Sequence, residues 1–226
     1  MRGRVFARGN TDLNLLRPNL IYLHGFASGP TSRKAQYFRE RFAAEGISIE
    51  IPDLAAGDFE HLTISGQLKV IESVANGKPV SLIGSSLGGY LAALYASRHP
   101  EVAKVVLLAP AFHFLRNWTE KLGLERAEAW KRTGSLPVYH YGDKTERHLD
   151  YAIVTDGQQY EPAPTFRQPA LIFHGTNDDV VPARFSEGYA ASHSNVKLRL
   201  LDSSHELTDV LETMWEDVRR FGVAIR

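Results

Sequence analysis

Six short apolar runs alternate along the chain with segments of helical periodicity, and this alternation limits the folds open to the sequence. The runs cover residues 20–23, 48–54, 79–86, 103–110, 169–175 and 196–202. Most of them are continuously apolar rather than alternating, which is typical of parallel strands covered by helices on both faces. The pattern therefore predicts an α/β fold with a mostly parallel central sheet of about six strands.

The segments between these runs predict the covering helices, at about residues 32–45, 63–75, 87–98 and 183–192. The clearest helical pattern comes last, and Ser203 and Glu206 have the spacing of a capping box at its start. Its apolar residues recur every three or four positions: Leu207, Val210, Leu211, Met214, Val218 and Phe221.

One interval, between Pro110 and Pro169, lacks the strand–helix rhythm. It predicts a helix at about residues 118–131 and a β-hairpin with arms at 137–141 and 148–154, joined by residues 142–147. An insertion of this length is more often a functional segment than a simple connection. We therefore expect a single domain over residues 1–226, with a lid or cap insertion at about 111–168.

The composition excludes several kinds of site. The 226 residues include no cysteine, which rules out a disulfide, a Cys nucleophile and a Cys-ligated metal, and favours a reducing, cytoplasmic setting. Lys and Arg total 26, as do Asp and Glu, so the charge suggests neither nucleic acid nor an anionic membrane as a partner. The first residues lack the apolar segment of a secretory leader, and no run is long enough to span a membrane.

Polar side chains follow the predicted strands at one edge of the sheet, where open α/β sheets bind their ligands. A serine follows the third run, an acid the fifth and a histidine the sixth, which is the minimum set for Ser–His–acid catalysis. Gly84-Ser85-Ser86-Leu87-Gly88 fits the G-x-S-x-G pattern of a nucleophile elbow, with Ser86 as the nucleophile. Ser85 does not fit, because position 83 is Ile, and we assign it to packing in the turn.

Four segments, "YLHGF", "GSSLGGY", "HGTNDDVVP" and "SSHEL", together resemble the α/β-hydrolase superfamily. "YLHGFASGPTSRKA" with "IGSSLGGYLA" resembles, more narrowly, the small bacterial esterases of the YqiA type. The resemblance implies an α/β-hydrolase fold, with His205 as general base and Asp178, the fourth residue after His174, as the acid. Asp179 and Asp202 remain alternative acids, whereas His24 and His174 are expected to be buried hydrogen-bonding residues.

The oxyanion hole is expected to use the backbone N–H groups of Phe26 and Leu87, whose side chains should also line the acyl pocket. The insertion is rich in aromatic residues, and we expect Tyr139 and Tyr141 among them to contact substrate. The other aromatic side chains there are expected to form a small satellite core.

The resemblance implies a serine carboxylesterase or thioesterase that acts on small-molecule esters through an acyl-Ser86 intermediate, without a metal or organic cofactor. Two alternatives stay open. One is an acyl-peptide hydrolase, and the other is a hydrolase-fold protein that binds a ligand with little turnover. The sequence carries no expectation about the oligomeric state.

Overall fold

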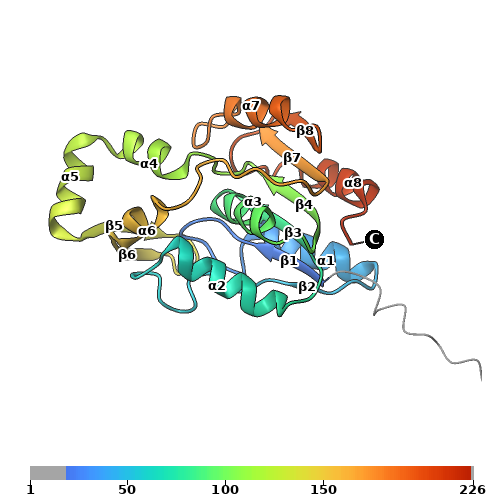
Figure 1. Ribbon diagram of the computed structural model, residues 1–226, viewed down its shortest axis with the longest axis horizontal. Helices are drawn as coiled ribbons and strands as arrows, with labels where there is room; N and C mark the ends of the chain where they lie inside the picture. The colour runs from blue at the N-terminus through green and yellow to red at the C-terminus, as the bar shows by residue number, and fades with distance from the viewer. Residues whose placement is uncertain (1–18, 225–226) are drawn as a thin grey trace, which may run out of the picture.

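A six-stranded parallel sheet forms the centre of the molecule (Figure 1). The structure is a computed structural model that describes residues 19–224. The strand order is β2-β1-β3-β4-β7-β8, and every neighbouring pair is parallel. The strands are β1 (Asn19–Leu23), β2 (Ile49–Glu50), β3 (Val80–Ser85), β4 (Val102–Leu108), β7 (Ala170–Gly175) and β8 (Val196–Leu201). The predicted sheet is confirmed, although β2 has only two residues because Pro52 follows it closely.

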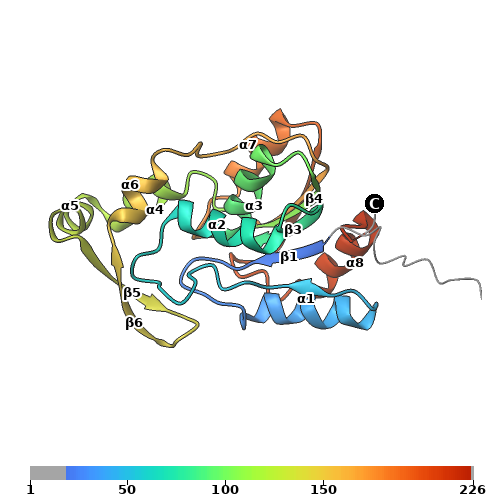
Figure 2. The same cartoon turned by 60° about the horizontal axis from the view of Figure 1, so that its bottom comes forward.

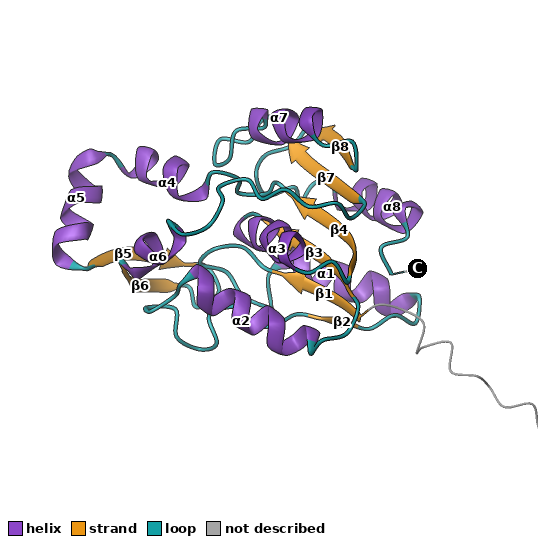
Figure 3. Ribbon diagram, in the orientation of Figure 1, coloured by secondary structure: helices purple, strands orange, loops and turns teal. Residues whose placement is uncertain are grey.

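Helices cover both faces of the sheet (Figures 2 and 3). On one face lie α1 (Arg33–Ala44) and α8 (Leu211–Phe221), and on the other lie α2 (Ile64–Ala75), α3 (Leu87–Arg98) and α7 (Arg184–Ser192). Alternate residues of each strand enter one of two separate cores: Ile21 and Leu82 face α2 and α3, whereas Tyr22 and Ile83 face α1 and α8. Both faces of the sheet are therefore buried, as the continuously apolar runs predict.

The long connection from β4 to β7 forms a lobe at one end of the sheet, drawn at the left of Figure 1. It contains α4 (Phe114–Leu122), α5 (Leu124–Thr133), the antiparallel strands β5 (Ser135–His140) and β6 (Thr145–Asp150), and α6 (Ala152–Gly157). The hairpin is confirmed, but its turn is shorter than expected. Residues 152–154 are helical rather than extended, because Ile153 and Val154 pack side by side into the lobe's own core.

Two helix expectations were wrong. The helix expected at residues 118–131 is split at Gly123, whose positive φ of 82° separates α4 from α5. The capping box at Ser203 and Glu206 does not form, because α8 begins at Leu211 and the Ser203 hydroxyl donates to Asp209 instead. The residues before α8 form a loop that lies over the carboxyl end of the sheet.

No helix within residues 19–224 is both long and apolar enough to cross a membrane.

Candidate active site

A sharp turn between β3 and α3 presents Ser86 at the edge of the sheet. Ser86 has φ of 53° and ψ of −116°, a conformation that costs energy for any residue with a side chain. A Cβ atom on Gly84 would lie 2.2 Å from the Gly88 carbonyl oxygen, and one on Gly88 would lie 2.2 Å from the Leu23 oxygen. The two glycines of the motif are therefore required, because β1, β3 and α3 approach too closely for any side chain there.

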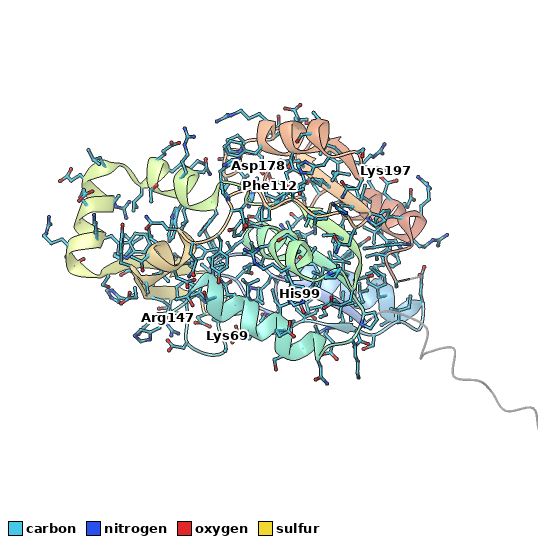
Figure 4. The ribbon with its side chains drawn as sticks, in the orientation of Figure 1. Lys69, His99, Phe112, Arg147, Asp178 and Lys197 are labelled. Carbon is cyan, nitrogen blue, oxygen red and sulfur yellow. The ribbon has the colours of Figure 1, made fainter. Side chains whose placement is uncertain are left out.

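Ser86, His205 and Asp178 lie in one continuous line of hydrogen bonds. His205 Nε2 is 3.1 Å from Ser86 Oγ, and His205 Nδ1 is 2.7 Å from Asp178 Oδ2. Asp178 comes from the loop between β7 and α7, where Figure 4 labels it, and His205 comes from the loop after β8. The structure thus brings together the three residues selected from the sequence.

The alternative acids lie elsewhere. Asp179 is exposed, and its backbone carbonyl accepts a hydrogen bond from Lys121. Asp202 is also exposed and accepts a hydrogen bond from the Asn177 side chain. Neither carboxylate contacts His205 among the hydrogen bonds of the described residues.

The Asp178 carboxylate is fully buried and is held by more than His205. Its Oδ1 accepts from the backbone N–H groups of Val180 and Val181, and its Oδ2 lies 3.1 Å from His174 Nε2. Burial by itself would raise the pKa of this carboxyl, but the hydrogen bonds from His174 and His205, with the charge of His205, lower it well below its usual range. Asp178 is therefore fixed in position and ionised.

His174 has its own hydrogen-bond partners, which set its tautomer. Its Nε2 lies near two acceptors, the Val181 carbonyl at 2.8 Å and Asp178, so this nitrogen carries the proton. Its Nδ1 then accepts from the Ser186 hydroxyl at 2.7 Å. The expectation that His174 is a buried hydrogen-bonding residue is confirmed, as it is for His24, whose Nε2 accepts from Leu54 N.

Phe26 and Leu87 are close to Ser86 along the chain or in space: Leu87 follows it directly, and a Cβ on Gly25, the neighbour of Phe26, would lie 3.4 Å from Ser86 Cβ. Leu87 is the first residue of α3, where N–H groups have no partner within the helix, and Phe26 lies in the loop after β1. Within residues 19–224, neither N–H donates to a protein acceptor. Both groups are therefore available to a negatively charged oxygen.

A cavity of about 960 Å³ opens beside Ser86 and His205. One side is aromatic, since the Phe26 ring lies 4.9 Å from that of Trp118 and 6.1 Å from that of Phe114, both on α4. The other side carries polar residues of the α1 N-terminus, including Lys34. The site thus combines an apolar wall supplied by the insertion with a polar wall supplied by the sheet framework.

Two residues expected to line this cavity do not reach it. The Leu87 side chain is buried in the core under α3, because the turn directs it away from the opening. Tyr139 faces solvent and is 52% exposed, because its neighbour His140 takes the inward position on β5 and packs on Phe59. Tyr141 does line the cavity, as does Phe26.

Lys34 is a residue of the site that the sequence did not single out. Its Nζ donates to the backbone oxygen of Glu206, next to His205, at 2.7 Å. Burial lowers the pKa of this lysine, although Glu206 and Asp178 oppose that effect. The contact joins positions 172 apart, and no local pattern could have revealed it.

Among residues 19–224, no group of three or more histidine or acidic side chains is arranged to hold a metal ion.

Residues 19–221 match the family described as "Uncharacterised protein family (UPF0227)". The mitochondrial palmitoyl-protein thioesterase ABHD10 of Bos taurus is 26% identical over 180 residues, which make up 73% of this chain and 58% of that protein. Monoacylglycerol lipase abhd6-B of Xenopus laevis is 27% identical over 107 residues, 42% of this chain and 31% of the lipase. The match therefore spans a little more than half the length of the thioesterase and about a third of the length of the lipase.

Solved structures share the fold over nearly the whole chain. Est1E from Butyrivibrio proteoclasticus, in a structure with ferulic acid bound, has a TM-score of 0.76 at 23% identity, covering 90% of this chain and 87% of that one. ABHD10 from mouse has a TM-score of 0.72 at 20% identity, covering 96% and 93%. The sheet and its helices have the α/β-hydrolase fold.

Proposed function

The chain belongs to the UPF0227 family, and from that membership and the geometry of its site we propose that it is a serine hydrolase. Its substrates are small-molecule carboxylic esters or thioesters, and its intermediate is an acyl-Ser86. The observation that carries this proposal is the unbroken contact from Ser86 through His205 to the buried carboxylate of Asp178.

In the first step, His205 Nε2 takes the Ser86 proton while Oγ attacks the substrate carbonyl carbon. The carbonyl oxygen becomes an oxyanion that accepts hydrogen bonds from the N–H groups of Phe26 and Leu87. His205 then gives its proton to the leaving alcohol or thiol, and the acyl group remains on Ser86. A water molecule, deprotonated by His205, attacks the acyl carbon, and His205 returns the proton to Ser86 Oγ as the bond to the acyl group breaks and the acid leaves.

Asp178 supports both steps without changing its own protonation state. Because its Oδ2 accepts from His205 Nδ1, the imidazole is held with Nε2 free to accept the serine proton. The lowered pKa of Asp178 keeps the negative charge that stabilises the imidazolium.

Two further observations favour esters and thioesters among possible substrates. The cavity beside Ser86 has an aromatic wall, which suits an acyl or aryl group. A thioesterase and a monoacylglycerol lipase are among the curated relatives.

The test is hydrolysis of a p-nitrophenyl ester series from acetate to palmitate, together with acyl-thioesters, by the parent chain and by Ser86→Ala. We expect turnover in the parent and a loss on the order of 10⁶ in kcat in Ser86→Ala, with an unchanged melting temperature. Ser85→Ala is the matched control. Ser85 is the neighbour of the nucleophile but has no role in the proposed reaction, so this variant should keep most of the activity. Equal turnover in Ser86→Ala and the parent would overturn the assignment, and ligand binding without an acyl-enzyme would indicate a binding protein.

A further inference from the structure

A second, smaller cavity lies behind the aromatic wall of the first. It has a volume of about 190 Å³ and lies among α2, α4 and α6. Its lining is mainly apolar and includes Ile64, Tyr90, Leu115 and Pro162. None of these four side chains lines the cavity that contains Ser86 and His205.

Phe114 is the side chain that the two cavities have in common. It is half-buried and packs against both the core under α3 and the separate core of the insertion. On the side of the active site its ring lies 6.1 Å from that of Phe26 and stacks at 5.2 Å on Trp118. Phe114 is therefore a partition one residue thick between the catalytic cavity and the second cavity.

The backbone around Phe114 holds this partition in place. His113, directly before it, has a positive φ of 60°, and its N–H donates to the Pro162 carbonyl at 2.8 Å. This bond fixes the first turn of α4 against the segment after α6. The backbone that carries Phe114 is thus held in place by this hydrogen bond.

We propose that the second cavity is a distal site for the far end of an acyl chain bound at Ser86, and that Phe114 sets the longest acyl group the enzyme accepts. This inference rests on the proposed function. An apolar cavity of about 150 Å³ in a protein can hold a benzene molecule, so a cavity of 190 Å³ has room for several methylene groups.

An acyl chain is the occupant that fits the surroundings. Phe114 lines both cavities, so an acyl chain attached to Ser86 would reach the second cavity past this side chain. The outer end of the second cavity reaches the surface near Gln158 and Pro162, which are exposed, so a longer chain need not fold back.

The experiment compares kcat/KM for p-nitrophenyl laurate and p-nitrophenyl butyrate in the parent and in Phe114→Ala. Removing the ring joins the cavities, and we expect the laurate-to-butyrate ratio to rise at least tenfold. Each methylene moved out of water improves binding by about fourfold, so two or three newly buried methylenes suffice. The ratio is used rather than either rate alone, because Phe114 also lines the catalytic cavity and its removal affects both substrates there.

Two variants make the interpretation specific. Trp118→Phe also enlarges the catalytic cavity but leaves Phe114 between the two spaces, and its laurate-to-butyrate ratio should stay near that of the parent. Adding Leu115→Phe to Phe114→Ala refills the second cavity and should return the ratio to the parent value. A rise in Trp118→Phe equal to that in Phe114→Ala, or no rise in a folded Phe114→Ala, overturns the proposal.

A binding measurement separates this proposal from the proposed function. Calorimetric titration with laurate and butyrate anions is done in the Ser86→Ala background, with and without Phe114→Ala. Tighter laurate binding on removal of Phe114 supports the distal site even if the parent hydrolyses no ester. Unchanged laurate binding in folded Ser86→Ala/Phe114→Ala, together with ester hydrolysis by the parent, contradicts the distal site while leaving the hydrolase assignment intact.

Discussion

The turn that carries Ser86 and the insertion that covers it are packed in opposite ways. Residues 87–96 of α3 are all buried. At Gly84 and Gly88 the neighbouring backbone is so close that a side chain would not fit. In the insertion, α4 has no fully buried residue and α5 has only Trp130. The turn is too closely packed to accept a larger residue, whereas the insertion is more exposed and is held by a small core of its own.

This difference separates two tasks of the molecule. Groups that would move protons or stabilise charge are held by the sheet framework, where positions are fixed to a fraction of an ångström. Phe114 and Trp118, which line the cavity and would face the non-reacting part of a substrate, come from the insertion. Substitutions in the framework should therefore abolish folding or chemistry, and those in the insertion should change selectivity or local stability.

The largest effect is expected from Gly88→Ala, which tests the close packing of the elbow. The new methyl group would lie 2.2 Å from the Leu23 oxygen and 2.5 Å from the His24 oxygen, so β1 or α3 must shift. We expect a loss of several kcal/mol, comparable with the whole stability of a domain, measured as denaturant unfolding or as absence of folded protein. Gly29→Ala is the control, because a Cβ there meets nothing within 4 Å. Equal stability of the two variants would contradict the packing argument.

Asp178→Asn tests the chemistry of the framework without changing its shape. An amide at this position can donate to His205 Nδ1, which leaves Nε2 protonated and unable to accept the serine proton. We expect kcat to fall by about 10⁴, with KM little changed. Asp179→Asn, on the exposed neighbour, should keep full activity, and a loss there equal to that of Asp178→Asn would move the acid assignment to Asp179.

The pH dependence of kcat/KM sharpens the same contrast. The lowered pKa of Asp178 keeps that carboxylate ionised through the mildly acidic range, so protonation of the acid does not limit activity there. A histidine that acts as general base stops working once it is protonated. Activity should therefore be full near neutrality and decrease roughly tenfold per pH unit on the acid limb. A profile that stays flat down to about pH 5 would argue against His205 as the base.

The smallest effect is expected from Trp130→Phe in the core of the insertion. The substitution removes the hydrogen bond from Trp130 Nε1 to the Leu149 carbonyl, which is 2.9 Å long and buried. We expect a local cost of about 1–3 kcal/mol, seen as faster hydrogen exchange in β5 and β6 with the central sheet unchanged. An equal increase of exchange in β3 and β4 would show that the two regions unfold together.

The framework could be predicted from the sequence because its signals are local. Continuous apolar runs mark buried parallel strands, and Gly84-x-Ser86-x-Gly88 combines a steric and a chemical requirement in five positions. Asp178 and His205 follow from their places after two strands of the same sheet edge. The structure brings these residues together as expected.

The insertion was harder to predict, because its structure depends on contacts between distant segments. Residues 152–154 have the apolar composition of a strand but become helical when they close the lobe's core. Tyr139 and Tyr141 are alike in sequence, but only Tyr141 lines the cavity, and its N–H donates to the carbonyl of the distant Ala27. Lys34 and Phe114 act through partners that no short-range pattern connects to them.

The sheet order also has a consequence for the newly synthesised protein. Ser86 follows β3 in a four-strand unit, β2-β1-β3-β4, that is complete by residue 108. His205 comes 119 positions after Ser86. At ribosomal speeds of about 5–20 residues per second, that interval lasts on the order of ten seconds. Asp178 precedes His205 by 27 residues, so the histidine is the last of the three residues to be synthesised. The proposed catalytic line can therefore form only after β7 and β8 have been synthesised and have joined the sheet.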